Sequence, residues 1–78
     1  MTTREKIVNI MKEVKPTKNL ENVSSIVEGG YIDSFELMNL IVMLSDSFGV
    51  EISIDEITPQ NFNSIDAISA MIDSLLQK

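Results

Sequence analysis

Residues 29–48 read GGYIDSFELMNLIVMLSDSF, and this stretch decides how the chain folds. After Asp33, apolar residues recur with the three- and four-residue spacing of an amphipathic helix. Asp33 is a preferred N-cap residue, and Glu36 three positions later completes a capping-box pattern. Gly49 follows the last apolar residue, where glycine commonly ends a helix. The sequence therefore predicts a helix that begins at Ser34 and ends before Gly49.

The rest of the chain is predicted to form two further long helices and one short helix. Thr2 with Glu5 repeats the capping-box pattern, and Pro16 stops that first helix. Thr58-Pro59 is a cap followed by proline at the first helical position, and Asn63 or Ser64 caps the last helix. We expect helices over residues 2–15, 34–48, 58–62 and 65–76.

Two connections complete the expected fold. Residues 15–31 form a long loop, and we expect apolar residues within it to pack against the core. Residues 50–54 alternate like a strand but have no partner strand, so we expect an extended loop held by its apolar residues. The predicted fold is all-α, a single domain over residues 1–78 with three main helices, one short helix and a long loop between the first two. The loop residues expected against the core are Leu20, Val23, Ile26 and Val27.

A helical wheel divides residues 34–48 into two apolar faces. The first face is the expected core stripe, and the second, formed by Phe35, Met38 and Val42, lies beside Ser34 with Asp46 on the same outer side. Two interpretations of this second face are open: further core, or a surface on which partners dock. The expected core consists of Ile7, Met11, Leu37, Leu40, Ile41, Leu44, Phe48, Ile52, Phe62, Ile68 and Ile72.

The composition of the chain argues against several classes of function. Twelve acidic and six basic residues give a net charge of −6, which repels nucleic acid and favours a basic partner. The chain has no histidine and no cysteine, so it lacks the usual catalytic base and nucleophile, and no set of residues predicts a metal site. The first residues are charged rather than signal-like, and no apolar run approaches the roughly 20 residues of a membrane span. We expect a monomeric, non-enzymatic protein of the cytoplasm that does not insert into membranes.

Ser34 stands out among the remaining candidates. As a helix-start serine it needs no role beyond capping, yet Asp33 already fills the cap. A phosphate ester on Ser34 would lie near the free amides of the first turn, where the helix dipole favours an anion. Asp33 would repel that anion unless its carboxylate has another task, such as holding a divalent cation during attachment.

The chain resembles the acyl carrier protein and peptidyl carrier protein superfamily. The resemblance lies in residues 30–40, GYIDSFELMNL, in FGVEI at 48–52, and in TPQNFNSI at 58–65. It implies that Ser34 receives 4′-phosphopantetheine from coenzyme A, that Asp33 assists this Mg²⁺-dependent attachment, and that the arm carries an acyl or aminoacyl thioester. It also implies that Phe35, Met38 and Val42 meet partner enzymes, and we expect the carboxylates of Glu36 and Asp46 to attract a basic partner.

The implied partners are a phosphopantetheinyl transferase, an acyl- or aminoacyl-activating ligase, and a downstream acyltransferase or synthase. Phe35 follows the serine where leucine or methionine is more usual, and the helix is less acidic than in carriers of fatty acid synthesis. Both departures argue against a housekeeping role in fatty acid synthesis. The loop that ends in TPQNF at 58–62 resembles that of stand-alone, specialised carriers served by a dedicated adenylating ligase. Two other functions stay open: an unmodified helical interaction protein, and a small acidic regulatory subunit or inhibitor.

Overall fold

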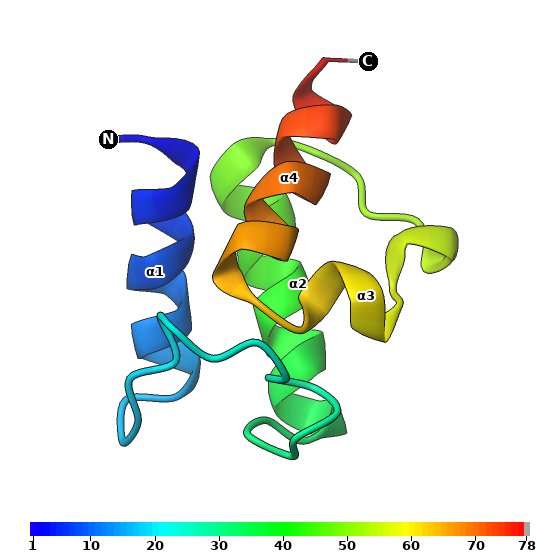
Figure 1. The fold of residues 1–78 in the computed structure, drawn as a ribbon. Coiled ribbons are helices and arrows are strands. Elements are labelled where there is room, and N and C mark those ends of the chain that lie inside the picture. The colour runs from blue at the N-terminus through cyan, green and yellow to red at the C-terminus, as the bar shows by residue number, and fades with distance from the viewer. Residues whose placement is uncertain (78) are drawn as a thin grey trace.

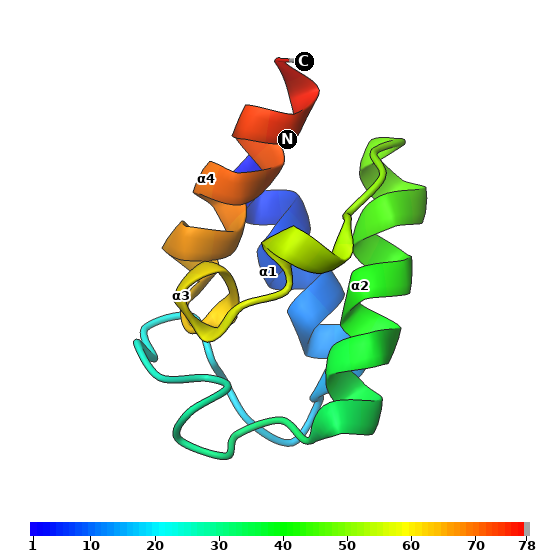
Figure 2. The same ribbon diagram turned by 90° about the vertical axis from the view of Figure 1, so that its right-hand side faces the viewer.

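The computed structural model describes residues 1–77 and is all-helical over that range (Figure 1). The helix α1 runs antiparallel to α2, α4 runs antiparallel to α1, and the short α3 crosses beside α4 (Figures 1 and 2). Packing joins α1 to both α2 and α4, and α3 to α4. This arrangement confirms the predicted bundle of three long helices and one short helix. The elements are α1 (Thr3–Val14), α2 (Ser34–Phe48), the 3-10 helix η1 (Ile54–Glu56), α3 (Pro59–Phe62) and α4 (Ile65–Leu76).

Local capping sets the helix boundaries within one residue of the predicted positions. The capping box of Thr2 and Glu5 is formed at the start of α1. Gly49 ends α2 with a φ of 65°, a left-handed conformation that glycine adopts without a steric penalty. The hydroxyl of Thr58 accepts a hydrogen bond at the start of α3, and that of Ser64 does so at the start of α4. Ser64, rather than Asn63, is therefore the cap of the last helix.

The long loop between α1 and α2 closes one end of the bundle, opposite the end where both chain termini lie (Figure 1). Leu20 and Ile26 are buried in the core, as expected, and Val23 and Val27 pack against it while partly exposed. Ile32, just before α2, is also buried. The loop is therefore part of the core, which places the start of α2 firmly against the bundle.

Asn63, at the junction of α3 and α4, holds this loop through hydrogen bonds. Its side-chain oxygen accepts from the backbone N–H groups of Val27 and Glu28, both at 3.1 Å. Its amide nitrogen donates to the Glu28 carboxylate at 2.6 Å, and its backbone carbonyl accepts from the N–H of Ile26 at 2.8 Å. One residue therefore secures three consecutive loop residues. Gly29 follows directly, and a Cβ there would lie 2.5 Å from the carbonyl oxygen of Ser25.

The core agrees with the sequence in part. Seven of the expected residues are buried: Ile7, Met11, Leu40, Leu44, Phe62, Ile68 and Ile72. Four others pack against that cluster but keep partial exposure, because they lie at its edge: Leu37, Ile41, Phe48 and Ile52. The expected core list omitted six buried residues, half of them from the loop and its end: Ile10, Leu20, Ile26, Ile32, Ile65 and Met71.

The segment after α2 also differs from the expectation. Val50 and Ile52 pack against the core, as an extended loop held by apolar residues requires. Ile54 instead opens the 3-10 helix η1 and is 83% exposed. Alternation of apolar residues holds only while the backbone stays extended, and the 3-10 turn changes the direction of the third side chain.

Candidate functional site

The first turn of α2 presents Ser34 to solvent. Asp33 is the N-cap: its Oδ1 accepts from the N–H of Glu36 at 2.8 Å, and Glu36 Oε1 accepts from the N–H of Asp33 at 3.0 Å. The capping box predicted from the sequence is therefore formed, and Ser34 has no capping task. Ser34 and Asp33 are both exposed, so an enzyme can reach the serine hydroxyl.

An ion pair between helices fixes this turn. The Nζ of Lys15, at the end of α1, donates to Glu36 Oε2 at 3.2 Å and to Oε1 at 3.4 Å. Both side chains are partly buried, with 27% and 22% of their surface exposed. Glu36 therefore has two intramolecular tasks, in the capping box and in the contact with α1. Its role in attracting a partner stays a prediction.

The second apolar face of α2 is a surface and not core. Phe35, Met38 and Val42 are 73%, 61% and 54% exposed. Their spacing of three and then four residues places them along one outward stripe of the helix. Leu40, on the opposite side, is fully buried. Of the two interpretations that the sequence left open, the structure therefore supports the exposed face, while partner binding by it stays a prediction.

A cavity of about 260 Å³ adjoins the serine. Val27, Ile32 and Leu37 line it together with Asp33 and Ser34, so apolar side chains from the loop and from α2 border the exposed hydroxyl. This hollow is open to a group attached to Ser34, because the serine itself is part of its wall.

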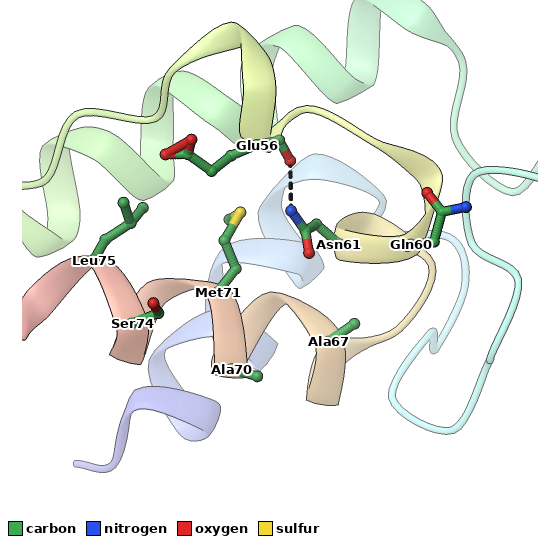
Figure 3. A pocket seen from close by; sticks show the side chains of 8 residues that line it. All are labelled: Glu56, Gln60, Asn61, Ala67, Ala70, Met71, Ser74 and Leu75. Carbon is green, nitrogen blue, oxygen red and sulfur yellow. Dashed lines mark hydrogen bonds between the residues drawn. The ribbon is translucent and has the colours of Figure 1, made fainter.

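A larger cavity of about 450 Å³ lies elsewhere, between η1, α3 and α4 (Figure 3). The side chains of Met71 and Leu75 point toward it from α4, and the amide nitrogen of Asn61 donates to the backbone carbonyl of Glu56 across its edge at 2.8 Å. Its lining residues include neither Asp33 nor Ser34. Its walls combine a methionine and a leucine with amides and one carboxylate, which is not an arrangement that supplies acid–base or nucleophilic chemistry.

Within the described residues, 1–77, no group of three or more carboxylates, histidines or cysteines is placed to hold a metal ion. Asp33 offers one exposed carboxylate beside Ser34, and its hydrogen bond to Glu36 occupies one of the two oxygens. A divalent cation at this point would need its remaining ligands from another molecule. None of the described helices is long and apolar enough to cross a membrane.

The site thus consists of an accessible serine at a helix start, an aspartate beside it and an apolar stripe along the same helix. Residues 5–72 match the family model described as a phosphopantetheine attachment site. The chain belongs to this family. Its members carry 4′-phosphopantetheine on a serine and act as carriers, typically without catalytic activity of their own. A comparison with curated proteins finds no match.

The family assignment confirms the resemblance and the cofactor that the sequence indicated, and the first turn of α2 fits that cofactor. Free amides and the helix dipole favour the phosphate, and the exposed hydroxyl is open to attachment. Sequence reasoning missed two residues that position this turn, Lys15 and Asn63. Their partners lie 21 to 36 residues away along the chain, so no local pattern marks them.

Proposed function

We propose that Ser34 carries 4′-phosphopantetheine and that the chain presents acyl or aminoacyl groups, held as thioesters, to partner enzymes. One observation carries this proposal: the hydroxyl of Ser34 is exposed in the first turn of α2, while Asp33 already provides the cap. A serine in that position is free for modification. It also lies within the residues that match the family.

Coenzyme A is the donor of the phosphopantetheine group in the attachment step. The Ser34 oxygen forms a bond to the pantetheine-side phosphorus of the coenzyme A pyrophosphate. The bond from that phosphorus to the bridging oxygen breaks, the adenosine bisphosphate leaves, and a base of the transferase takes the hydroxyl proton. Asp33 would supply one ligand to the Mg²⁺ that offsets the charge of the pyrophosphate, with the other ligands from the transferase and the nucleotide.

The attached group supplies the thiol that the chain lacks, and the protein supplies its presentation. Lys15 and Glu36 hold the first turn of α2 in place, and Asn63 holds the loop that precedes it. We propose that a dedicated ligase loads the thiol and that an acyltransferase or synthase consumes the thioester. We further propose that this occurs in the cytoplasm.

Intact mass tests the proposal. The chain, incubated with coenzyme A, Mg²⁺ and a broad-range phosphopantetheinyl transferase, should gain the mass of one phosphopantetheine group. Ser34→Ala should gain nothing, whereas Ser47→Ala, which removes another exposed hydroxyl of α2, should gain one group as the wild type does. Modification of Ser34→Ala would overturn the assignment. Absence of modification in the wild type would favour an unmodified interaction or regulatory protein.

A further inference from the structure

A basic cleft lies at the end of α1, apart from the cavity that adjoins Ser34. It has a volume of about 370 Å³, and one residue of α1 and four residues of the following loop line it. The polar residues of its wall are all exposed, so a small molecule can reach them from solvent. The lining residues are Lys12, Pro16, Thr17, Lys18 and Asn19.

The backbone that follows α1 forms a closed turn and shapes this cleft. Pro16 cannot continue the helix, and the N–H of Lys18 donates to the carbonyl of Lys15 at 3.4 Å. The side-chain oxygen of Asn19 accepts from the N–H of Glu21 at 3.0 Å, so the amide nitrogen of Asn19 keeps its two N–H donors. The cleft therefore offers two ammonium groups, a hydroxyl and an amide donor, with no carboxylate in its wall.

The two lysines of the cleft are not neutralised by the fold. Within residues 1–77, Arg4 and Lys15 form ion pairs with carboxylates, whereas Lys12 and Lys18 form none. Glu21 borders a smaller hollow beside the two lysines, but Arg4 holds its carboxylate at 3.2 Å. Lys12 lies in the last turn of α1, where the helix dipole favours a cation, but Lys18 lies beyond the helix. Two like charges at one cavity repel each other, and a bound anion would stabilise both.

The donors of the cleft suit a phosphate group better than a carboxylate. A phosphate carries up to two negative charges near neutral pH and has three strong acceptor oxygens. It can therefore accept hydrogen bonds from both ammonium groups and from a hydroxyl or amide at the same time, whereas a carboxylate brings one charge. Lysine commonly binds phosphate in proteins. A phosphate group fills only part of about 370 Å³, so the cleft also has room for part of the molecule that bears it.

We propose that Lys12 and Lys18, with Thr17 and Asn19, form a binding site for the phosphate dianion of a small molecule. The end of α1 and the start of α2 lie at the same end of the bundle (Figures 1 and 2). Inorganic phosphate and the 3′-phosphate on the ribose of coenzyme A are two sources of this chemistry. The site goes beyond the proposed attachment at Ser34 and does not depend on it.

Titration of the ¹⁵N-labelled, unmodified chain with inorganic phosphate tests the site, followed by the NMR signals of its backbone amides. The titration is done at about pH 8, where the dianion dominates, with the ionic strength held constant and with no transferase or Mg²⁺ present. The signals of residues 17–19 should shift and saturate, while those of α4 stay in place. Lys12→Gln and Lys18→Gln should each raise Kd about sixfold, the factor that corresponds to one charge pair about 4 Å apart in water.

Lys6→Gln is the matched control, because it removes the same charge from another exposed lysine of α1 that does not line the cleft. It should leave Kd unchanged, and circular dichroism should give equal helix content for all three variants, since their side chains are exposed. Coenzyme A and dephospho-coenzyme A, which lacks the 3′-phosphate, distinguish the two sources. Tighter binding of coenzyme A at residues 17–19 identifies its 3′-phosphate as the ligand, whereas shifts with inorganic phosphate alone identify free phosphate.

Three results would overturn the inference. The first is the absence of a saturable shift at residues 17–19 with any of the three phosphate compounds. The second is an equal rise of Kd in Lys6→Gln, which would show general attraction by charge rather than a site. The third is binding of an oligoglutamate peptide without binding of phosphate, which would show a docking surface for an acidic protein segment. Because the titration uses the unmodified chain, its failure would leave attachment at Ser34 untouched, and a failure of attachment would leave the phosphate site standing.

Discussion

Removal of the Asn63 side chain should loosen the loop that leads to the first turn of α2. Asn63→Ala deletes three hydrogen bonds: two from the backbone N–H groups of Val27 and Glu28, and one to the Glu28 carboxylate. The hydrogen bond from the N–H of Ile26 survives, because it ends on the backbone carbonyl of residue 63. The variant therefore tests the side-chain bonds alone.

The magnitude follows from the burial of these bonds. A net hydrogen bond contributes roughly 0.5–1.5 kcal/mol to folding, with the upper values where water is excluded. The bond from Val27 is partly buried and the two bonds of Glu28 are exposed, so one bond near the upper value and two near the lower give about 2.5 kcal/mol. For a domain of this size, 1 kcal/mol lowers the thermal midpoint by about 4–8 °C, so Asn63→Ala should lower it by roughly 10–20 °C.

Thermal and urea denaturation followed by circular dichroism measure this loss, and amide hydrogen exchange locates it. Exchange at Val27 and Glu28 should accelerate more than exchange in the centre of α1. Asn22→Ala is the matched control, because it changes an exposed asparagine in the same loop. If Asn63→Ala melts at the same temperature as Asn22→Ala, or if amide exchange at Val27 and Glu28 stays slow, then Asn63 does not hold the loop and the reasoning is wrong.

Three further predictions concern folding. Leu40→Ala should lower the free energy of unfolding by about 2–5 kcal/mol, because this side chain is fully buried. Met38 is 61% exposed, so Met38→Ala should be tolerated. Equal melting temperatures of the two variants would contradict the assignment of the two faces. Gly30 has a φ of 73°, so Gly30→Ala should lower the free energy of unfolding, measured by urea denaturation, by about 1–2 kcal/mol, and Gly30→Asn should lower it less. An unchanged urea midpoint for Gly30→Ala would show that this turn relaxes freely. Hydrogen bonds from the backbone N–H and the side chain of Thr2 lower the pKa of Glu5 below its ordinary value of 4.5. The stabilisation from these bonds is therefore present above pH 4.5 and is lost as the pH falls through the lowered pKa. Glu5→Gln should flatten the acid side of the curve of stability against pH, and a curve identical to that of the wild type would refute the link.

Among the residues expected at the site, Glu36 is the one whose interpretation the structure changes most. From the sequence, its carboxylate has two uses, in the capping box and in attracting a basic partner. The structure adds a third, the pair with Lys15, which joins the end of α1 to the start of α2. A substitution of Glu36 would therefore disturb the turn that carries Ser34 as well as any ionic contact, so Phe35 and Met38 give the cleaner test of docking.

Much of this protein's helical structure was determined by sequence patterns whose residues lie only a few positions apart. The capping boxes at Thr2 and Asp33, the glycine at 49 and the proline at 59 fix the helix boundaries, because a cap satisfies backbone groups only three or four residues away. Helical spacing also fixed the buried stripe of α2. The candidate site depends on the same local rules, since Ser34 is exposed in a first turn that Asp33 already caps.

Only the tertiary structure decided which apolar face of α2 stays in water and what secures its first turn. Helical periodicity identifies two apolar faces but cannot say how many neighbours cover them, and here α1 and the loop leave Phe35, Met38 and Val42 exposed. Lys15 and Asn63 reach partners 21 to 36 residues away, and such contacts exist only after the chain has closed around its core. Local backbone chemistry therefore built the helix that bears Ser34, and long-range packing determined how that serine is held and which surface stands beside it.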